Sequence, residues 1–178
     1  MARKAFGRNG FHGVSMEEVA RDAGVTKPIL YDHFNSKRDL YLALIEADAA
    51  DLQERVGAAL VARTGNRERI RASYQAYFDF VDEHAEGFRL VMQEAQSPAS
   101  MSSAVDTVRE RILQEVAKAI MAESGKPITK ADADMLAVGL VAMVEAGAQR
   151  TPGVDTVTRK RQLDVLLRLA WRGMAHLG

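Results

Sequence analysis

Residues 14–39 read VSMEEVARDAGVTKPILYDHFNSKRD, and this stretch decides the fold. Ser15 is followed three residues later by Glu18, which is a capping box and predicts that a helix begins here. Thr26 can cap a second helix, and only residues 23–25 separate the two. A connection that short forces the helices to cross steeply. The stretch therefore predicts a helix-turn-helix.

The turn between the two helices carries its own signal. Gly24 stands where the chain needs a positive φ to turn sharply. Ala20, four residues earlier, is small where the second helix must approach closely. Apolar contacts that lock the pair together are expected from Val19, Ala23, Val25 and Leu30.

The second helix is expected to present a polar outer face. Its apolar residues Ile29, Leu30 and Phe34 are predicted to face inward, which leaves Thr26, Lys27, Tyr31, Asp32 and His33 outside. A short helix with a hydroxyl and a cation at its amino end can enter the major groove of DNA, which is about 12 Å wide. Lys27 can reach guanine or a phosphate, and Thr26 can offer its methyl group to thymine.

Phosphate contacts would fix the register on DNA without reading its sequence. Tyr31 and His33 can supply them by hydrogen bonds. Lys37 begins the next helix, where its ammonium adds to the positive end of the helix dipole. A surface aromatic at residue 31 and a helix-terminal cation at residue 33 are the plainer readings of these two side chains.

Outward from this stretch, apolar residues recur at helical spacing, and no two-residue alternation of β-branched residues interrupts them. Ser36 with Asp39, and Thr129 with Asp132, repeat the capping-box spacing, while Gly13, Gly65 and Gly125 mark stops. The chain is therefore predicted to be all-α, with nine helices at residues 2–9, 15–22, 26–34, 37–63, 67–83, 86–95, 99–123, 130–150 and 157–176.

Composition excludes several classes of protein. The 178 residues are 47% hydrophobic and 27% charged, which is ordinary for a globular protein that buries its own core. Cys is absent, so thiolate metal sites and cysteine nucleophiles are excluded. No stretch reaches the roughly 18 apolar residues of a membrane span. No signal peptide is recognisable at the amino end, so a cytoplasmic protein without membrane attachment is expected.

At this point the chain resembles the TetR-type transcriptional regulators. Three strings carry the resemblance: FGRNGFHGVSM at residues 6–16, VARDAGVTK at 19–27 and LYDHFNSKRDL at 30–40. The match is close over residues 2–45 and extends to the rest only in helical layout. It implies a homodimer that binds a palindromic double-stranded DNA operator and releases it when a small molecule enters the carboxyl-terminal domain.

The residues that we predict to contact the operator are Ser15, Met16, Thr26, Lys27, Pro28, Tyr31, His33 and Lys37. Pro28 departs from the family pattern, which often has a small residue there, so one donor is lost. Family members also carry another turn ahead of the first helix, often with basic residues. We therefore expect residue 1 to lie inside that helix.

The chain is expected to divide into a helix-turn-helix DNA-binding domain at residues 1–44 and a ligand-binding and dimerisation domain at residues 45–178. Apolar stripes in the second domain can be plain core or can line a cavity for a small lipophilic effector. The predicted lining is Tyr74, Tyr77, Phe78, Phe88, Met92, Ile112, Val116 and Met143.

The last two helices read as a dimer surface. Helix 130–150 is rich in small residues, and helix 157–176 carries apolar residues at spacings of four and three, which is typical of a seam with another helix. The predicted interface residues are Ala142, Ala146, Leu163, Leu167, Ala170, Trp171 and Met174. A monomer in which both helices are internal is the alternative.

No catalytic, cofactor or metal constellation is identifiable. The four His residues lack metal-ligand spacing, and no Ser-His-Asp arrangement occurs. Gly7, Gly10 and Gly13 have no preceding strand, so they do not form a phosphate loop. The sequence therefore favours a non-enzyme, a ligand-responsive repressor, over a helical carrier or an interaction module that does not bind specific DNA.

Charge agrees with this reading only when it is divided along the chain. The total is zero, but residues 1–44 hold seven Lys or Arg against five Asp or Glu, a net charge of +2. The remainder is then −2. Affinity for DNA should come from a few well-placed phosphate contacts rather than from a broad basic field.

Overall fold

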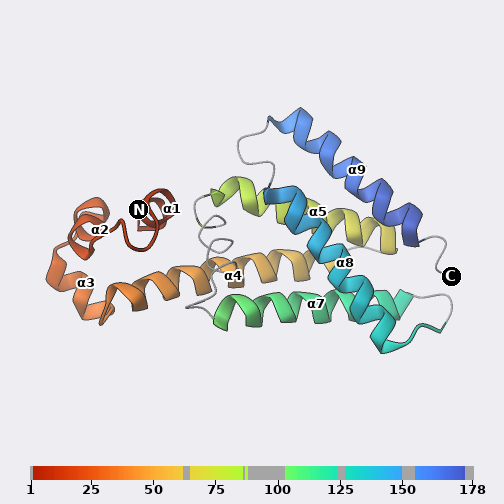
Figure 1. Cartoon of the computed structure of the whole chain (residues 1–178), viewed down its shortest axis with the longest axis horizontal. Coiled ribbons are helices and arrows are strands. Elements are labelled where there is room, and N and C mark those ends of the chain that lie inside the picture. Colours follow the sequence, from red (N-terminus) through yellow and green to blue (C-terminus); the bar gives the residue numbers. More distant parts are fainter. Residues whose placement is uncertain are drawn as a thin grey trace. The chain divides into compact units, whose positions relative to one another are not determined.

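The computed structural model describes residues 2–61, 65–85, 87, 103–123, 127–149 and 155–174. Within these ranges the chain is helical and contains no strand (Figure 1). The helices are α1 (Ala2–Asn9), α2 (Met16–Ala23), α3 (Lys27–His33), α4 (Lys37–Val61), α5 (Asn66–Glu83), α7 (Ser103–Glu123), α8 (Lys130–Gln149) and α9 (Thr156–Met174). The all-α prediction is confirmed. The predicted helix 86–95 lies almost wholly outside the described residues.

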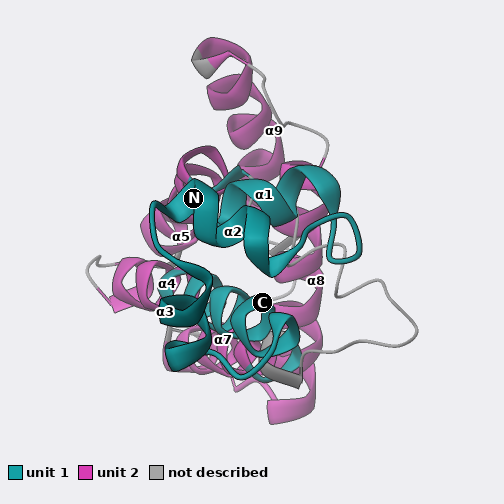
Figure 2. Ribbon diagram, turned by 90° about the vertical axis from the view of Figure 1, so that its left-hand side faces the viewer, with its two compact units in different colours: residues 1–51, 84–107 teal, residues 52–83, 108–178 magenta. Residues whose placement is uncertain are grey.

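The described chain falls into two compact units, coloured separately in Figure 2. Residues 1–51 with 84–107 form the first unit, and residues 52–83 with 108–178 form the second. The boundary between residues 51 and 52 lies inside α4, which continues without a break from one unit into the other.

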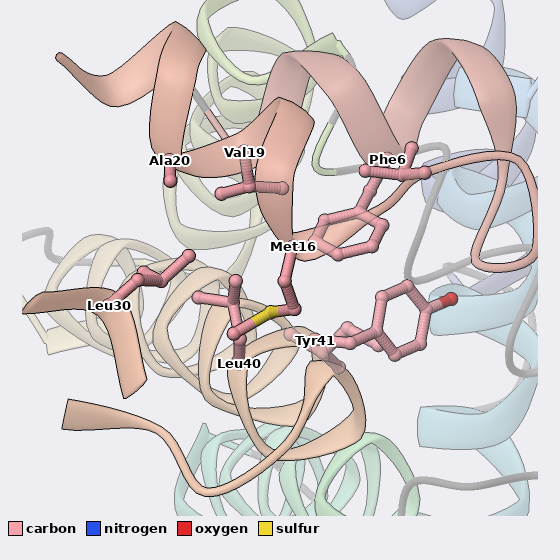
Figure 3. Packing of buried hydrophobic residues seen from close by; sticks show 9 residues of the cluster. Phe6, Met16, Val19, Ala20, Leu30, Leu40 and Tyr41 are labelled. Atoms are coloured by element: carbon pink, nitrogen blue, oxygen red, sulfur yellow. The ribbon is translucent and has the colours of Figure 1, made fainter. Parts of the chain in front are cut away.

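The core of the first unit holds α1, α2 and α3 against the start of α4. Phe6 is fully buried, and its ring meets the ring of Tyr41 edge to face at 5.3 Å between centroids. Figure 3 shows the cluster, in which side chains from all four helices meet. Its buried members are Phe6, Val14, Met16, Val19, Ala20, Leu30, Leu40, Tyr41 and Ile45. This packing fixes the direction of α3.

An ion pair joins α1 to α4 in the same unit. Asp48 is 1% exposed, and its Oδ1 is 2.6 Å from Nε of Arg3. Burial raises the pKa of the Asp48 carboxyl, and the charge of Arg3 opposes that rise. A Cβ at Gly87 would collide with Oδ2 of Asp48, so the glycine makes room for the carboxylate.

The second unit is tied together by polar contacts between its helices. The Tyr74 hydroxyl on α5 donates to the carbonyl oxygen of Leu140 on α8 at 2.8 Å. Arg109 on α7 makes two parallel hydrogen bonds to Glu145 on α8, at 3.0 and 3.1 Å. Arg159 on α9 pairs with Asp82 on α5. In the ranges that the structure covers, no helix is long and apolar enough to cross a membrane.

Candidate DNA-binding site

Local bonding shapes the turn of the helix-turn-helix as the sequence predicts. The Ser15 backbone N–H donates to Glu18 Oε2 at 2.7 Å, and the Glu18 N–H donates to Ser15 Oγ at 3.2 Å, which completes the capping box. Gly24 has φ 71°, and the Val25 N–H closes the helix end on the Ala20 carbonyl at 3.0 Å. The helix-turn-helix prediction is confirmed.

Helix α3 exposes the polar face that the sequence predicts. Thr26, Lys27, Pro28, Tyr31 and His33 are all exposed. Thr26 occupies the N-cap position with φ −83° and ψ 154°, but its side chain makes no capping hydrogen bond. Thr26 is therefore the N-cap as expected, but its hydroxyl is not committed to the helix end. Because the residues at the amino end of α3 are exposed, they are accessible to a DNA groove.

Lys27 is held by α2 rather than extended into solvent. Its ammonium forms an ion pair with Glu17 and lies 5.8 Å from the ring centroid of Tyr31. The hydrogen bond from Lys27 lowers the pKa of the Glu17 carboxyl, and the same bond raises the pKa of Lys27. Both side chains are well exposed, so the pair is weak and Lys27 can exchange Glu17 for a DNA group.

Ile29 is an exposed residue of α3 that the sequence predicts to be in the core. It is 45% exposed, so the expectation that it faces inward is wrong. Val25 and Ala23 are also exposed rather than locked between the helices. Only Leu30 of α3 is buried, and Phe34, four residues later, packs against the same cluster. An exposed Ile on α3 can contact a thymine methyl group.

Lys37 has a structural role that the sequence did not reveal. Its ammonium donates to the carbonyl oxygens of Phe11 at 3.0 Å and Val14 at 2.9 Å, and lies 4.4 Å from the Phe11 ring centroid. Two of its three N–H donors therefore hold the connection between α1 and α2. Only the third is left for a phosphate.

Ser15 and Met16 take different positions from those expected of DNA contacts. The Ser15 hydroxyl donates to Glu18 at 2.8 Å, so it is occupied by the capping box. Met16 is 4% exposed, because its side chain belongs to the core. The structure therefore leaves only its main-chain amide, at the amino end of α2, for a phosphate.

Replacing Lys37 with Met is expected to destabilise the DNA-free protein by about 2–3 kcal/mol. Hydrogen bonds to charged groups each contribute roughly 1.5–3 kcal/mol, and water recovers part of the loss here. Urea unfolding followed by circular dichroism measures the change. Arg38→Met is the matched control, because Arg38 is exposed at the next position. If Lys37→Met left the stability unchanged, the structural role of Lys37 would be contradicted, and contact with a phosphate would be its remaining role.

The predicted effector-pocket residues gather in the second unit. Tyr74, Tyr77 and Phe78 of α5 and Ile112 and Val116 of α7 are buried, and Met143 of α8 is half-buried. Phe88 and Met92 lie outside the described residues. The Tyr74 hydroxyl is bonded to Leu140, so its polar tip is not aimed at a ligand. Burial raises the pKa of the Tyr77 hydroxyl, which keeps it neutral.

The predicted dimer residues divide into two groups. Leu163 and Ala170 are buried inside the single chain, and Leu167 is half-buried, whereas Ala142, Ala146 and Trp171 are exposed. The side chain of Met174 is not among those described. Each helix also exposes larger apolar residues that were not predicted: Met135 and Val138 on α8, and Val165 and Leu169 on α9.

An exposed helix end, positioned by a glycine turn and presenting a cation and hydroxyls, defines a helix-turn-helix DNA-binding protein. Residues 1–44 match the family model of the bacterial regulatory proteins of the tetR family, and residues 66–173 match the tetracyclin repressor-like C-terminal domain. The chain belongs to the TetR family of transcriptional regulators, whose members bind operator DNA and small effectors. It is therefore a DNA-binding transcriptional regulator and not an enzyme.

Individual relatives agree with this membership. The chain is 33% identical over 178 residues to the HTH-type transcriptional activator FasR of Mycolicibacterium smegmatis, covering 99% of this chain and 80% of that protein. A TetR-like transcriptional regulator from Rhodococcus sp. RHA1 has a similar structure, with a TM-score of 0.80, 29% identity and coverage of 98% and 92%. AibR, solved with isovaleryl coenzyme A and operator DNA, shares the fold at a TM-score of 0.75 and 20% identity, covering 94% and 92%.

Proposed function

We propose that the protein represses transcription by binding a palindromic operator as a homodimer, and that a small lipophilic effector releases it. The observation that carries the DNA contact is the exposed surface of α3 and its N-cap, which includes Thr26, Lys27, Ile29 and Tyr31. We propose that residues 1–44 form the DNA-binding domain, and that residues 45–178 bind the effector and the second subunit. It would act in the cytoplasm, where bacterial DNA lies.

The proposed dimer uses the exposed stripes of α8 and α9. Met135, Val138 and Ala142 follow one another at spacings of three and four, so they share one side of α8. Gly139 lies in the same stripe, with open space where a Cβ would stand, which permits close approach of another helix. A two-fold axis then presents the same surface from both subunits.

In the proposed mechanism, the effector releases the operator by changing the distance between the two recognition helices of the dimer. Two such helices must lie about 34–36 Å apart to enter successive major grooves. An effector can weaken DNA binding only by favouring a spacing that does not fit. Helix α4 is the element that runs from the DNA-reading unit into the body, so it is the element we expect to transmit the change.

Replacing Lys27 with Met is expected to weaken binding to a selected operator and to change which bases are preferred near α3. Loss of one good base contact costs about 1–3 kcal/mol. Random-site selection followed by fluorescence anisotropy measures both effects. Lys118→Met is the matched control, because Lys118 is an exposed lysine on α7 of the second unit.

Glu17→Gln provides the opposite change in the same assay. It replaces the ion pair with Lys27 by a weaker hydrogen bond to a neutral amide and removes a negative charge beside the DNA surface, so operator affinity should rise. Equal effects of Lys27→Met and Lys118→Met, or no DNA selected by the unaltered protein, would contradict the proposal and favour a non-DNA interaction module or carrier.

Activation is the second candidate for the direction of regulation, because a 33% identical relative is an activator. Transcription in vitro from the selected operator distinguishes the two. Under the proposal, adding the protein lowers transcript yield and an effector restores it. A rise in transcript yield on adding the protein would replace repression by activation.

A further inference from the structure

A basic groove with a volume of about 730 Å³ lies between α5 and α9 in the second unit. The first turns of α5 form one wall and most of α9 forms the other. The groove is separate from the predicted effector pocket, because none of the residues predicted for that pocket lines it. Its cationic lining consists of Arg67, Arg71, Lys160, Arg161, Arg168 and Arg172.

Two contacts fix the geometry of this α5/α9 groove. The Arg67 guanidinium lies 6.0 Å from the ring centroid of Trp171, and Arg71 Nη2 is 2.8 Å from Asp164 Oδ1. The amino end of α5 therefore lies beside the carboxyl-terminal half of α9. The exposed N–H groups of that helix end add partial positive charge to the same region.

The positive charge of the groove favours an anionic ligand. Six cations face two carboxylates, Glu68 and Asp164, so the lining has a formal charge of +4 in a chain whose total is zero. Asp164 is already paired with Arg71. Arg168 and Arg161 follow at one-turn intervals on either side of Asp164, where guanidinium groups suit the planar oxygens of phosphates.

The groove also offers a surface for a flat ring. Trp171 is the only tryptophan of the chain, and Ile70 and Leu167 line the groove with it. The indole is 37% exposed although it is large and apolar. Nucleobases stack on such rings, with a contribution of about 1–3 kcal/mol per base.

We propose that the α5/α9 groove binds a nucleoside polyphosphate, with the base against Trp171 and the phosphates on Arg168, Arg161 and Lys160. Arg161 and Trp171 are ten residues apart, which is about 15 Å along a helix and suits an extended nucleotide. The groove volume falls in the range of roughly 300–1,000 Å³ that small-molecule sites occupy. This assignment does not depend on the proposed repressor function. It places Leu167 and Trp171 in the groove rather than in the predicted dimer interface.

The fluorescence of Trp171 reports on the site directly, since no other tryptophan contributes. The full-length protein is titrated with ATP, adenosine and inorganic tripolyphosphate at constant ionic strength. ATP should quench the emission in a saturable way. Adenosine and tripolyphosphate should each bind at least about tenfold more weakly. Adenosine lacks the phosphates that contact the cationic side chains, and tripolyphosphate lacks the base that stacks on Trp171.

Single substitutions distinguish binding in the groove from general attraction of ATP to positive charge. Arg168→Gln should weaken ATP binding about tenfold. Arg111→Gln on α7 should leave it unchanged, because Arg111 is exposed in the same unit but does not line the groove. Trp171→Ala, followed by calorimetry, should weaken ATP about tenfold and tripolyphosphate little.

Three results would overturn the assignment. They are the absence of a saturable response to millimolar ATP, equal affinity for ATP and tripolyphosphate, and equal losses in Arg168→Gln and Arg111→Gln. The second result would mean that the groove attracts any polyanion, including an acidic peptide. DNA binding by the unaltered protein remains measurable in each case.

Discussion

The Phe6→Ala variant is expected to lose the folded structure of its DNA-reading unit. Phe6 is fully buried and packs against the rings of Tyr41 and Phe11. Deleting a buried phenyl ring costs about 3–5 kcal/mol, a large part of the roughly 5–15 kcal/mol that keeps a typical domain folded. Hydrogen exchange of core amides in residues 2–44 should accelerate by about 100-fold or more, and operator binding should fall with it.

Phe11→Ala is the matched control for this loss. Phe11 is half-buried at the edge of the same cluster, so its removal leaves a space that water can enter. We expect less than half of the destabilisation. Equal exchange rates in the two variants would show that the ring of Phe6 is not the centre of the core.

A Met135→Asp, Leu169→Asp double variant is expected to be monomeric and to bind the operator at least about 100-fold more weakly. Met135 and Leu169 are 71% and 61% exposed on α8 and α9, so the chain folds without covering them. Carboxylates there would be buried unpaired in the proposed dimer, at a cost of several kcal/mol. A single subunit then loses the avidity of two linked half-sites, which is about 10²–10⁴.

Met121→Asp controls for the added charge. Met121 is an exposed methionine on α7, outside the proposed interface. It should leave sedimentation and operator affinity unchanged. A dimeric double variant, or an unaltered protein that sediments as a monomer, would move the interface elsewhere and remove the basis for a palindromic operator.

Local signals explain why the helices were predictable. The side-chain caps at Ser36 and Thr129 form as expected, since each hydroxyl accepts a hydrogen bond at 3.1 Å from the backbone N–H three residues later. A cap and a helix stop are decided by neighbours three or four residues apart, and these are visible in the sequence. Helix bounds therefore differ from the prediction by at most two residues, except where residues 99–102 of the predicted 99–123 are not described.

The candidate site was less predictable because its contacts cross between elements. Lys37 bonds to carbonyl groups 23 and 26 residues away, and nothing local distinguishes it from a surface lysine. The apolar character of Ile29 predicts a place in the core, although the surface of a recognition helix can also be apolar. The Arg3–Asp48 pair likewise joins α1 to α4 across 45 residues. Sequence spacing cannot reveal such distant partners.

The uninterrupted passage of α4 across the unit boundary has a consequence for engineering. Each residue turns an α-helix by about 100° and lengthens it by about 1.5 Å. A chimera that joins residues 1–51 to the body of another regulator must therefore keep the residue count of this helix, because one deletion rotates everything that follows by more than a quarter turn. Seven inserted residues nearly restore the phase but add about 10 Å. The number of residues in α4 is therefore the quantity that such a chimera has to preserve.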